Sequence, residues 1–159
     1  MKITVLCVGK LKEKFMRDAV SEYQKRLSRY VKMEIIEVAD EKTPDRASEK
    51  EERGIRDREG ERLIKYIKPE DYVIALAIDG PQYDSVAFAR KLEKYGISGK
   101  GNVVFLIGGS LGLCEAVMKR ADETISFSKM TFPHQLMRVI LLEQIYRGYR
   151  IIKKEPYHK

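Results

Sequence analysis

The fold is decided by the stretch Asn102-Val103-Val104-Phe105-Leu106-Ile107, which runs directly into Gly108-Gly109-Ser110-Leu111-Gly112-Leu113. Its unbroken apolar run predicts a strand that is covered on both faces of a parallel sheet. Residues 72–78 form a second apolar run, which stops at the turn Asp79-Gly80-Pro81. Ligands bind beyond the carboxyl ends of such strands, so we expect a site near residues 76–80 and 108–112.

The other elements alternate outward from this stretch. Apolar residues at four-residue spacing predict an amphipathic first helix, and Ser48-Glu49-Lys50-Glu51 has the spacing of a capping box. We expect strands at residues 2–9, 33–38, 72–78 and 102–107, a short strand near 125, and helices at 15–27, 48–67, 85–95 (capped by Ser85) and from Pro133 onward. The alternation predicts an α/β fold: one domain over residues 1–159, with a mostly parallel sheet and helices on both faces.

The positive charge is concentrated at the two ends of the chain. The formal net charge is +7. Residues 1–32 hold nine Lys or Arg against three acids, and residues 129–159 hold seven against two, whereas residues 40–62 hold seven against nine. Such segregation raises the expectation of a polyanionic partner such as nucleic acid, although surplus lysine also serves solubility.

The cysteines and the hydropathy pattern favour a cytoplasmic protein. Cys7 and Cys114 have no CxxC spacing and no histidine cluster around them, so we expect buried reduced thiols and no metal. No apolar run approaches the roughly 20 residues of a membrane span, and no signal peptide is recognisable at the N-terminus.

The glycine turn after residue 107 excludes several ligand classes. Its G-G-x-x-G pattern is not the G-x-G-x-x-G of a dinucleotide site, and Gly99-Lys100-Gly101 lacks the spacing of a phosphate-binding Walker loop. Gly109-Ser110-Leu111 is not a nucleophile elbow. What remains is a backbone-lined pocket for a small, largely apolar or aromatic ligand.

The final helix predicts a second subunit. It is apolar on almost every side, which is typical of a helix buried on more than one face, so we expect a homodimer. Arg138 falls within its apolar arc, with His134 one turn earlier. Two interpretations of Arg138 stay open: a salt bridge within the fold or dimer interface, or a guanidinium held for a phosphate or base edge.

Two further features leave alternatives open. Pro156-Tyr157-His158 combines a rigid turn, an aromatic ring and a side chain that titrates near neutrality, so the tail is either frayed or in contact with substrate. Glu59 lies in line with the apolar residues of its helix and beside Gly60. It is either solvated or salt-bridged, or it belongs to a site.

Several segments together resemble the RlmH family of SPOUT-class methyltransferases. They are Val8-Gly9-Lys10-Leu11-Lys12-Glu13-Lys14, Asp40-Glu41-Lys42, the turn at 108–113, the segment 125–138 and Pro156-Tyr157-His158-Lys159. The resemblance covers essentially the whole chain and implies an S-adenosylmethionine-dependent enzyme. The implied reaction is methylation of N3 of a pseudouridine in the helix-69 loop of 23S ribosomal RNA, on assembled 70S ribosomes. A trefoil-knotted fold and an obligatory homodimer are also implied.

The resemblance also implies the site residues. Carried over by motif, the cofactor contacts are Leu76, Gly108, Phe127, Ser128, Lys129, Met130, Thr131 and Phe132, and the substrate-side residues are Arg138, Tyr157 and His158. We expect His158 to accept the proton of the target nitrogen and Arg138 to stabilise the developing charge. The alternatives are a non-catalytic ribosome-binding factor and, disfavoured by the glycine spacing, a Rossmann-type oxidoreductase.

Overall fold

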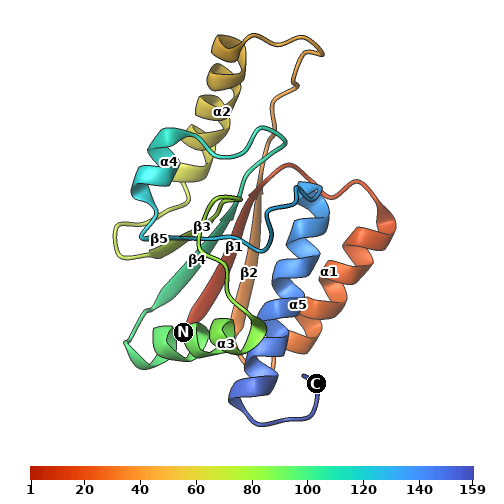
Figure 1. Cartoon of the computed structure of the whole chain (residues 1–159), viewed down its shortest axis with the longest axis vertical. Helices are drawn as coiled ribbons and strands as arrows, with labels where there is room; N and C mark the ends of the chain where they lie inside the picture. Colours follow the sequence, from red (N-terminus) through yellow and green to blue (C-terminus); the bar gives the residue numbers. More distant parts are fainter.

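A computed structural model describes all 159 residues. Five parallel strands form one sheet in the order β2-β1-β4-β3-β5, and helices cover both of its faces (Figure 1). The strands are β1 (Lys2–Val8), β2 (Lys32–Val38), β3 (Tyr72–Leu76), β4 (Asn102–Ile107) and β5 (Glu123–Ile125). The helices are α1 (Lys14–Leu27), α2 (Glu49–Ile64), α3 (Ser85–Ile97), α4 (Glu115–Arg120) and α5 (His134–Ile152). The predicted α/β class and parallel sheet are confirmed.

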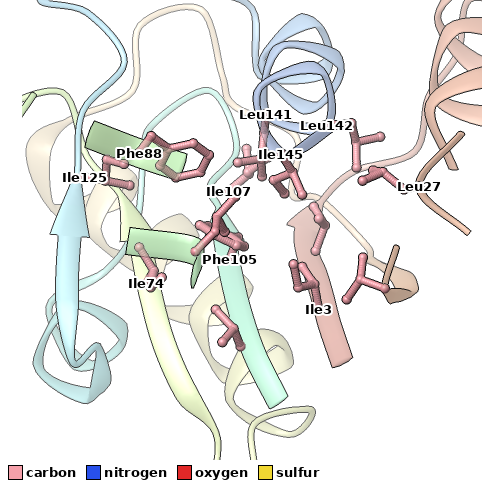
Figure 2. Close-up of a cluster of buried hydrophobic side chains, with 14 of the residues drawn as sticks. Ile3, Leu27, Ile74, Phe88, Phe105, Ile107, Ile125, Leu141, Leu142 and Ile145 are labelled. Atoms are coloured by element: carbon pink, nitrogen blue, oxygen red, sulfur yellow. The ribbon is translucent and has the colours of Figure 1, made fainter. Parts of the chain in front are cut away.

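The central strands are buried on both faces because two helical layers sandwich them. Along β1, Ile3 and Val5 belong to one core, and Leu6 and Val8 belong to the other. The first core lies under α1, α3 and α5 (Figure 2) and the second lies under α2 and α4. Burial of side chains on both sides is the reason why these strands show no apolar–polar alternation.

Several element boundaries differ from the sequence prediction by a few residues, and three differences concern the ends of helices. Asp84, not Ser85, caps α3, since its carboxylate accepts a hydrogen bond from Ala87 N at 2.7 Å, whereas the Ser85 hydroxyl donates to Gln144 at 2.7 Å. Helix α2 has the predicted Ser48 capping box, but it ends at Ile64. Pro133 is the residue before α5 and not part of its first turn, because its ψ of 133° is extended.

Both cysteines are free and buried, as the sequence predicts. Burial raises the pKa of Cys7 to about 12, more than the nearby Arg138 lowers it, which keeps this thiol protonated and unreactive. None of the helices combines the length and apolar character required to cross a membrane. The trefoil knot implied by the resemblance stays a prediction.

Candidate active site

A cavity of about 1220 Å³ lies beyond the carboxyl ends of β3 and β4, where the parallel sheet predicts a ligand. Leu76 and Gly108, which end these strands, line it together with the loop between β5 and α5. Side chains of α2 and α4 also reach it, including Arg53, Arg56 and Met118. The cavity is therefore bordered by elements from both helical layers.

The turn after β4 is built from backbone. A Cβ atom at Gly108 would lie 2.7 Å from the carbonyl carbon of Gly112, so no larger residue fits there without a shift of the main chain. Gly112 has a φ of +83° and donates its N–H to the Gly109 carbonyl at 3.1 Å. At its glycines the tight turn presents main-chain atoms along this wall of the cavity.

The loop between β5 and α5 is held by its serines. The Ser126 hydroxyl is 3.0 Å from the carbonyl oxygens of both Ile78 and Ser128, and Met130 N donates to the Ser128 hydroxyl at 3.0 Å. The Phe127 ring packs edge-on against Phe88, with ring centroids 6.1 Å apart. These contacts give the loop a defined shape.

Seven of the eight cofactor positions predicted from the family resemblance line this one cavity. They are Leu76, Gly108, Phe127, Ser128, Met130, Thr131 and Phe132. Lys129 is exposed and does not line it. The structure thus brings together residues that are more than fifty positions apart in the chain, and their role in cofactor binding stays a prediction.

Arg138 is a fully buried residue and lies inside the fold. Its Nη1 donates to the Glu37 carboxylate at 2.5 Å, and its Nη2 donates to the Gly9 carbonyl at 3.0 Å. The interpretation of Arg138 as a salt bridge within the fold is therefore confirmed. In the single chain the guanidinium is bound to the ends of β1 and β2. The second interpretation, a guanidinium held for a phosphate or base edge in a composite site, stays a prediction.

The tail is folded back on α5 instead of fraying. The Tyr157 hydroxyl donates to Glu143 at 3.1 Å, Arg147 lies over the Tyr157 ring at 4.6 Å, and Arg147 Nη1 is 3.3 Å from His158 Nδ1. Burial and the Glu143 carboxylate raise the pKa of Tyr157 to about 12. The phenol is therefore a hydrogen-bond donor at neutral pH.

Sequence reasoning missed Glu143 and Arg147, which organise this tail. The two side chains are one helical turn apart and paired at 2.6 Å. Their i, i+4 spacing was the available signal, but such pairs are usual on helix surfaces. Only the return of the chain terminus onto α5 distinguishes this pair from the others.

The predicted catalytic residues are not gathered at one point in this chain. Tyr157 and His158 lie together, and His158 lines a second cavity of about 540 Å³. This second cavity shares Phe127 and Phe132 with the first. Arg138 belongs to neither cavity, so the single chain separates it from the tail.

Two acid–base groups near the glycine turn have unusual environments. His134 lines the first cavity, and burial, followed by the charge of Arg138, lowers its pKa. Glu59 is buried, accepts a hydrogen bond from Glu41 N at 3.0 Å and has no ion-pair partner, and burial raises its pKa. The expectation that Glu59 is solvated or salt-bridged is wrong, because the side chain is buried without an ion-pair partner. Its carboxylate lies next to Gly109 of the glycine turn.

A glycine-built cavity at the carboxyl ends of a parallel sheet, bordered by a long loop, defines a class of nucleotide- or cofactor-binding α/β protein. A family profile described as "Predicted SPOUT methyltransferase" matches residues 1–158. The chain belongs to this family of SPOUT methyltransferases.

Its relatives narrow the comparison further. The chain is 60% identical to Ribosomal RNA large subunit methyltransferase H of Bifidobacterium adolescentis. It is 57% and 56% identical to the proteins of the same name from Clostridium kluyveri and Clostridium beijerinckii. Each comparison covers 100% of both chains.

Proposed function

We propose that this protein is an S-adenosylmethionine-dependent methyltransferase of large-subunit ribosomal RNA, acting in the cytoplasm. The proposed target is N3 of a pseudouridine in the helix-69 loop of the assembled 70S ribosome. The observation that carries the proposal is the cavity beyond the carboxyl ends of β3 and β4, which has no room for a side chain at Gly108 and whose lining includes Leu76 and Phe127. The chain is 57–60% identical, over its full length, to proteins named as ribosomal RNA methyltransferases, and this similarity supports the RNA substrate.

The residues of the cavity fit the proposed cofactor. Leu76, Ile107, Leu113 and Phe127 offer apolar surface for an adenine ring, and the turn at Gly108 offers main-chain polar groups for the ribose and amino-acid parts. The bound cofactor would supply an electrophilic methyl group. Because methyl transfer is an in-line displacement, the protein contributes mainly position and exclusion of water.

The proposed homodimer would complete the site with the tail. Leu136, Val139 and Ile140 of α5 remain partly exposed in the single chain, which supports burial by a second copy. The tail of one protomer would then meet the cofactor cavity of its partner. In this arrangement Glu143 and Arg147 hold Tyr157 and His158 in place, and Arg138 stabilises the fold.

The proton of the target nitrogen must leave during the transfer, and His158 is the proposed acceptor. In the folded tail, a hydrogen bond from Arg147 to His158 Nδ1 places the imidazole proton on Nε2, because an arginine is always a donor. In this tautomer Nε2 donates a hydrogen bond to the substrate. Nδ1 becomes free to accept the proton when RNA displaces its contact with Arg147.

Calorimetry and mass spectrometry test the proposal together. S-adenosylmethionine should release heat on binding to the wild-type protein and not to Gly108→Ala, while a Gly96→Ala control, at an open helix position, should bind normally. Ribosomal RNA from a strain lacking the gene should lose one methyl group, which the wild-type gene restores. RNA binding without cofactor heat would instead identify a non-catalytic ribosome-binding factor.

A further inference from the structure

The loop between β1 and α1 presents unpaired positive charge beside the first cavity. Lys10 and Lys12 are exposed and form no ion pair within the chain, whereas the neighbouring Lys14 pairs with Asp18 at 2.7 Å. Glu13 is the only acid among residues 9–14. The loop therefore keeps a positive charge that no internal carboxylate neutralises.

This loop is held in place by its main chain. Leu11 N donates to Glu37 at 3.2 Å and Lys12 N donates to Gln135 at 3.3 Å. Arg17 donates to the Lys12 carbonyl at 2.7 Å. Because these bonds fix the backbone, a ligand that binds the lysine side chains would order only the side chains and not the loop.

The same loop is tied to the wall of the cavity. Arg138 donates to the Gly9 carbonyl, and a Cβ at Gly9 would lie 3.6 Å from His134 Nε2. His134 lines the cavity. Figure 1 shows the loop passing the start of α5 on its way to α1. A polymer lying on Lys10 and Lys12 would thus pass the cavity mouth.

An aromatic ring extends this surface. Phe15, in the first turn of α1, is 65% exposed. A single exposed phenylalanine is common, but this ring follows two unpaired lysines on an anchored loop. Phosphate-binding cations next to a stacking ring form the usual binding surface for unpaired nucleic acid.

We infer that residues 10–15 form an RNA-binding edge of the active site. Lys10 and Lys12 contact phosphates of unpaired RNA, and Phe15 stacks on a base close to the nucleotide that enters the cavity. This inference rests on the proposed function, because it takes RNA as the substrate. It assigns to the β1–α1 loop the task of positioning the strand.

The charge contribution is tested with the double variant Lys10→Gln/Lys12→Gln. Binding of a fluorescently labelled single-stranded RNA oligonucleotide is measured by anisotropy over a salt series. Loss of two phosphate contacts should make the plot of log affinity against log salt less steep, with a slope smaller in magnitude by about 1.4. This change corresponds to roughly tenfold weaker binding at 0.15 M salt. The matched control is Lys50→Gln/Lys65→Gln, two exposed lysines of the α2 region without ion pairs, which should leave the slope unchanged.

The stacking contribution is tested with Phe15→Ala. We expect at least about fivefold weaker RNA binding with the salt slope retained, because stacking is not an ionic contact. Sedimentation of the same variant should show an unchanged oligomer. Dissociation of the oligomer would overturn the inference for Phe15 and assign the ring to a subunit contact, and binding to anionic vesicles in place of RNA would overturn it for the whole loop.

Cofactor titration separates this inference from the proposed function. All three variants should bind S-adenosylmethionine as the wild type does, since no substituted residue lines the cavity. Wild-type RNA affinity in both loop variants, with normal methyl transfer, would refute the RNA-binding edge alone. A wild-type protein that binds neither cofactor nor RNA would refute the proposed function and the inference with it.

Discussion

The two helical layers cover the same sheet but differ in how they hold their buried charge. In the layer of α1, α3 and α5, the buried Arg138 is paired with Glu37. In the layer of α2 and α4, the buried Glu59 has only the N–H of Glu41 as a partner. Paired charges stabilise one fixed arrangement, whereas an unpaired buried acid leaves the second layer sensitive to pH.

The layers also differ in how closely their helices approach their neighbours. A Cβ atom at Gly60 of α2 would lie 2.2 Å from Cys114 Sγ. A Cβ atom at Gly148 of α5 would lie 2.7 Å from Leu92 Cδ1 of α3. The positive charge of the two chain ends lies in the same helical layer, because α1 packs against α5. We therefore expect substrate contacts from the first layer and support of the glycine turn from the second.

The largest effect should follow from breaking the buried ion pair. Arg138→Met removes the guanidinium from the Gly9 carbonyl and from the Glu37 carboxylate, which keeps only Leu11 N as a donor. Because Glu37 is partly exposed, we expect a loss of about 3 kcal/mol in the free energy of unfolding, the lower end for a broken buried pair, measured with urea. The control Arg29→Met removes a solvent-exposed pair at 4.0 Å and should cost less than about 1 kcal/mol. An equal loss of stability in the two variants would contradict the view that the buried pair of Arg138 holds the first layer.

A smaller loss should follow from filling the close contact of the second layer. In Gly60→Ala the new methyl group overlaps Cys114 Sγ and lies 3.2 Å from Val117 Cγ2, so we expect about 2 kcal/mol of destabilisation. Gly148→Ala meets the movable Leu92 Cδ1 and should cost less. Gly96→Ala meets no atom within 4 Å and should stabilise by about 0.5 kcal/mol. Thermal unfolding of the three variants gives the order.

The tail contact should contribute less again. Tyr157→Phe removes the hydrogen bond to Glu143 and keeps the ring, so the stability should fall by about 1 kcal/mol or less. Amide hydrogen exchange of residues 153–159 should become faster, while exchange in α1 stays the same. Unchanged protection of the tail would show that ring packing alone holds it.

The pH dependence gives the smallest effect. Burial raises the pKa of Glu59, so the folded protein keeps this proton to higher pH than the unfolded chain does. The ionised carboxylate therefore destabilises the fold above the raised pKa, and the penalty vanishes below the ordinary glutamate pKa of about 4.3. Glu59→Gln should have a higher melting temperature than the wild type at pH 8 and an equal one at pH 4. Glu61→Gln, an exposed neighbour, should change neither.

The sequence by itself determined the strands, the parallel sheet and the edge at which the cavity lies. These follow from local rules. Unbroken apolar runs need cover on both faces, and a glycine follows each strand, Gly108 directly after β4 and Gly80 in the turn shortly after β3. The capping box at Ser48 is of the same kind, because its hydrogen bonds join residues three positions apart.

Only the tertiary structure decided the partners of the charged side chains. Arg138 meets Glu37 across a separation of 101 residues, and the terminus returns to Glu143 and Arg147. Glu59 lies behind the glycine turn because α2 packs beside α4. Charges interact through space, so their partners depend on how the helices pack on the sheet and not on the local spacing that predicts the helices themselves.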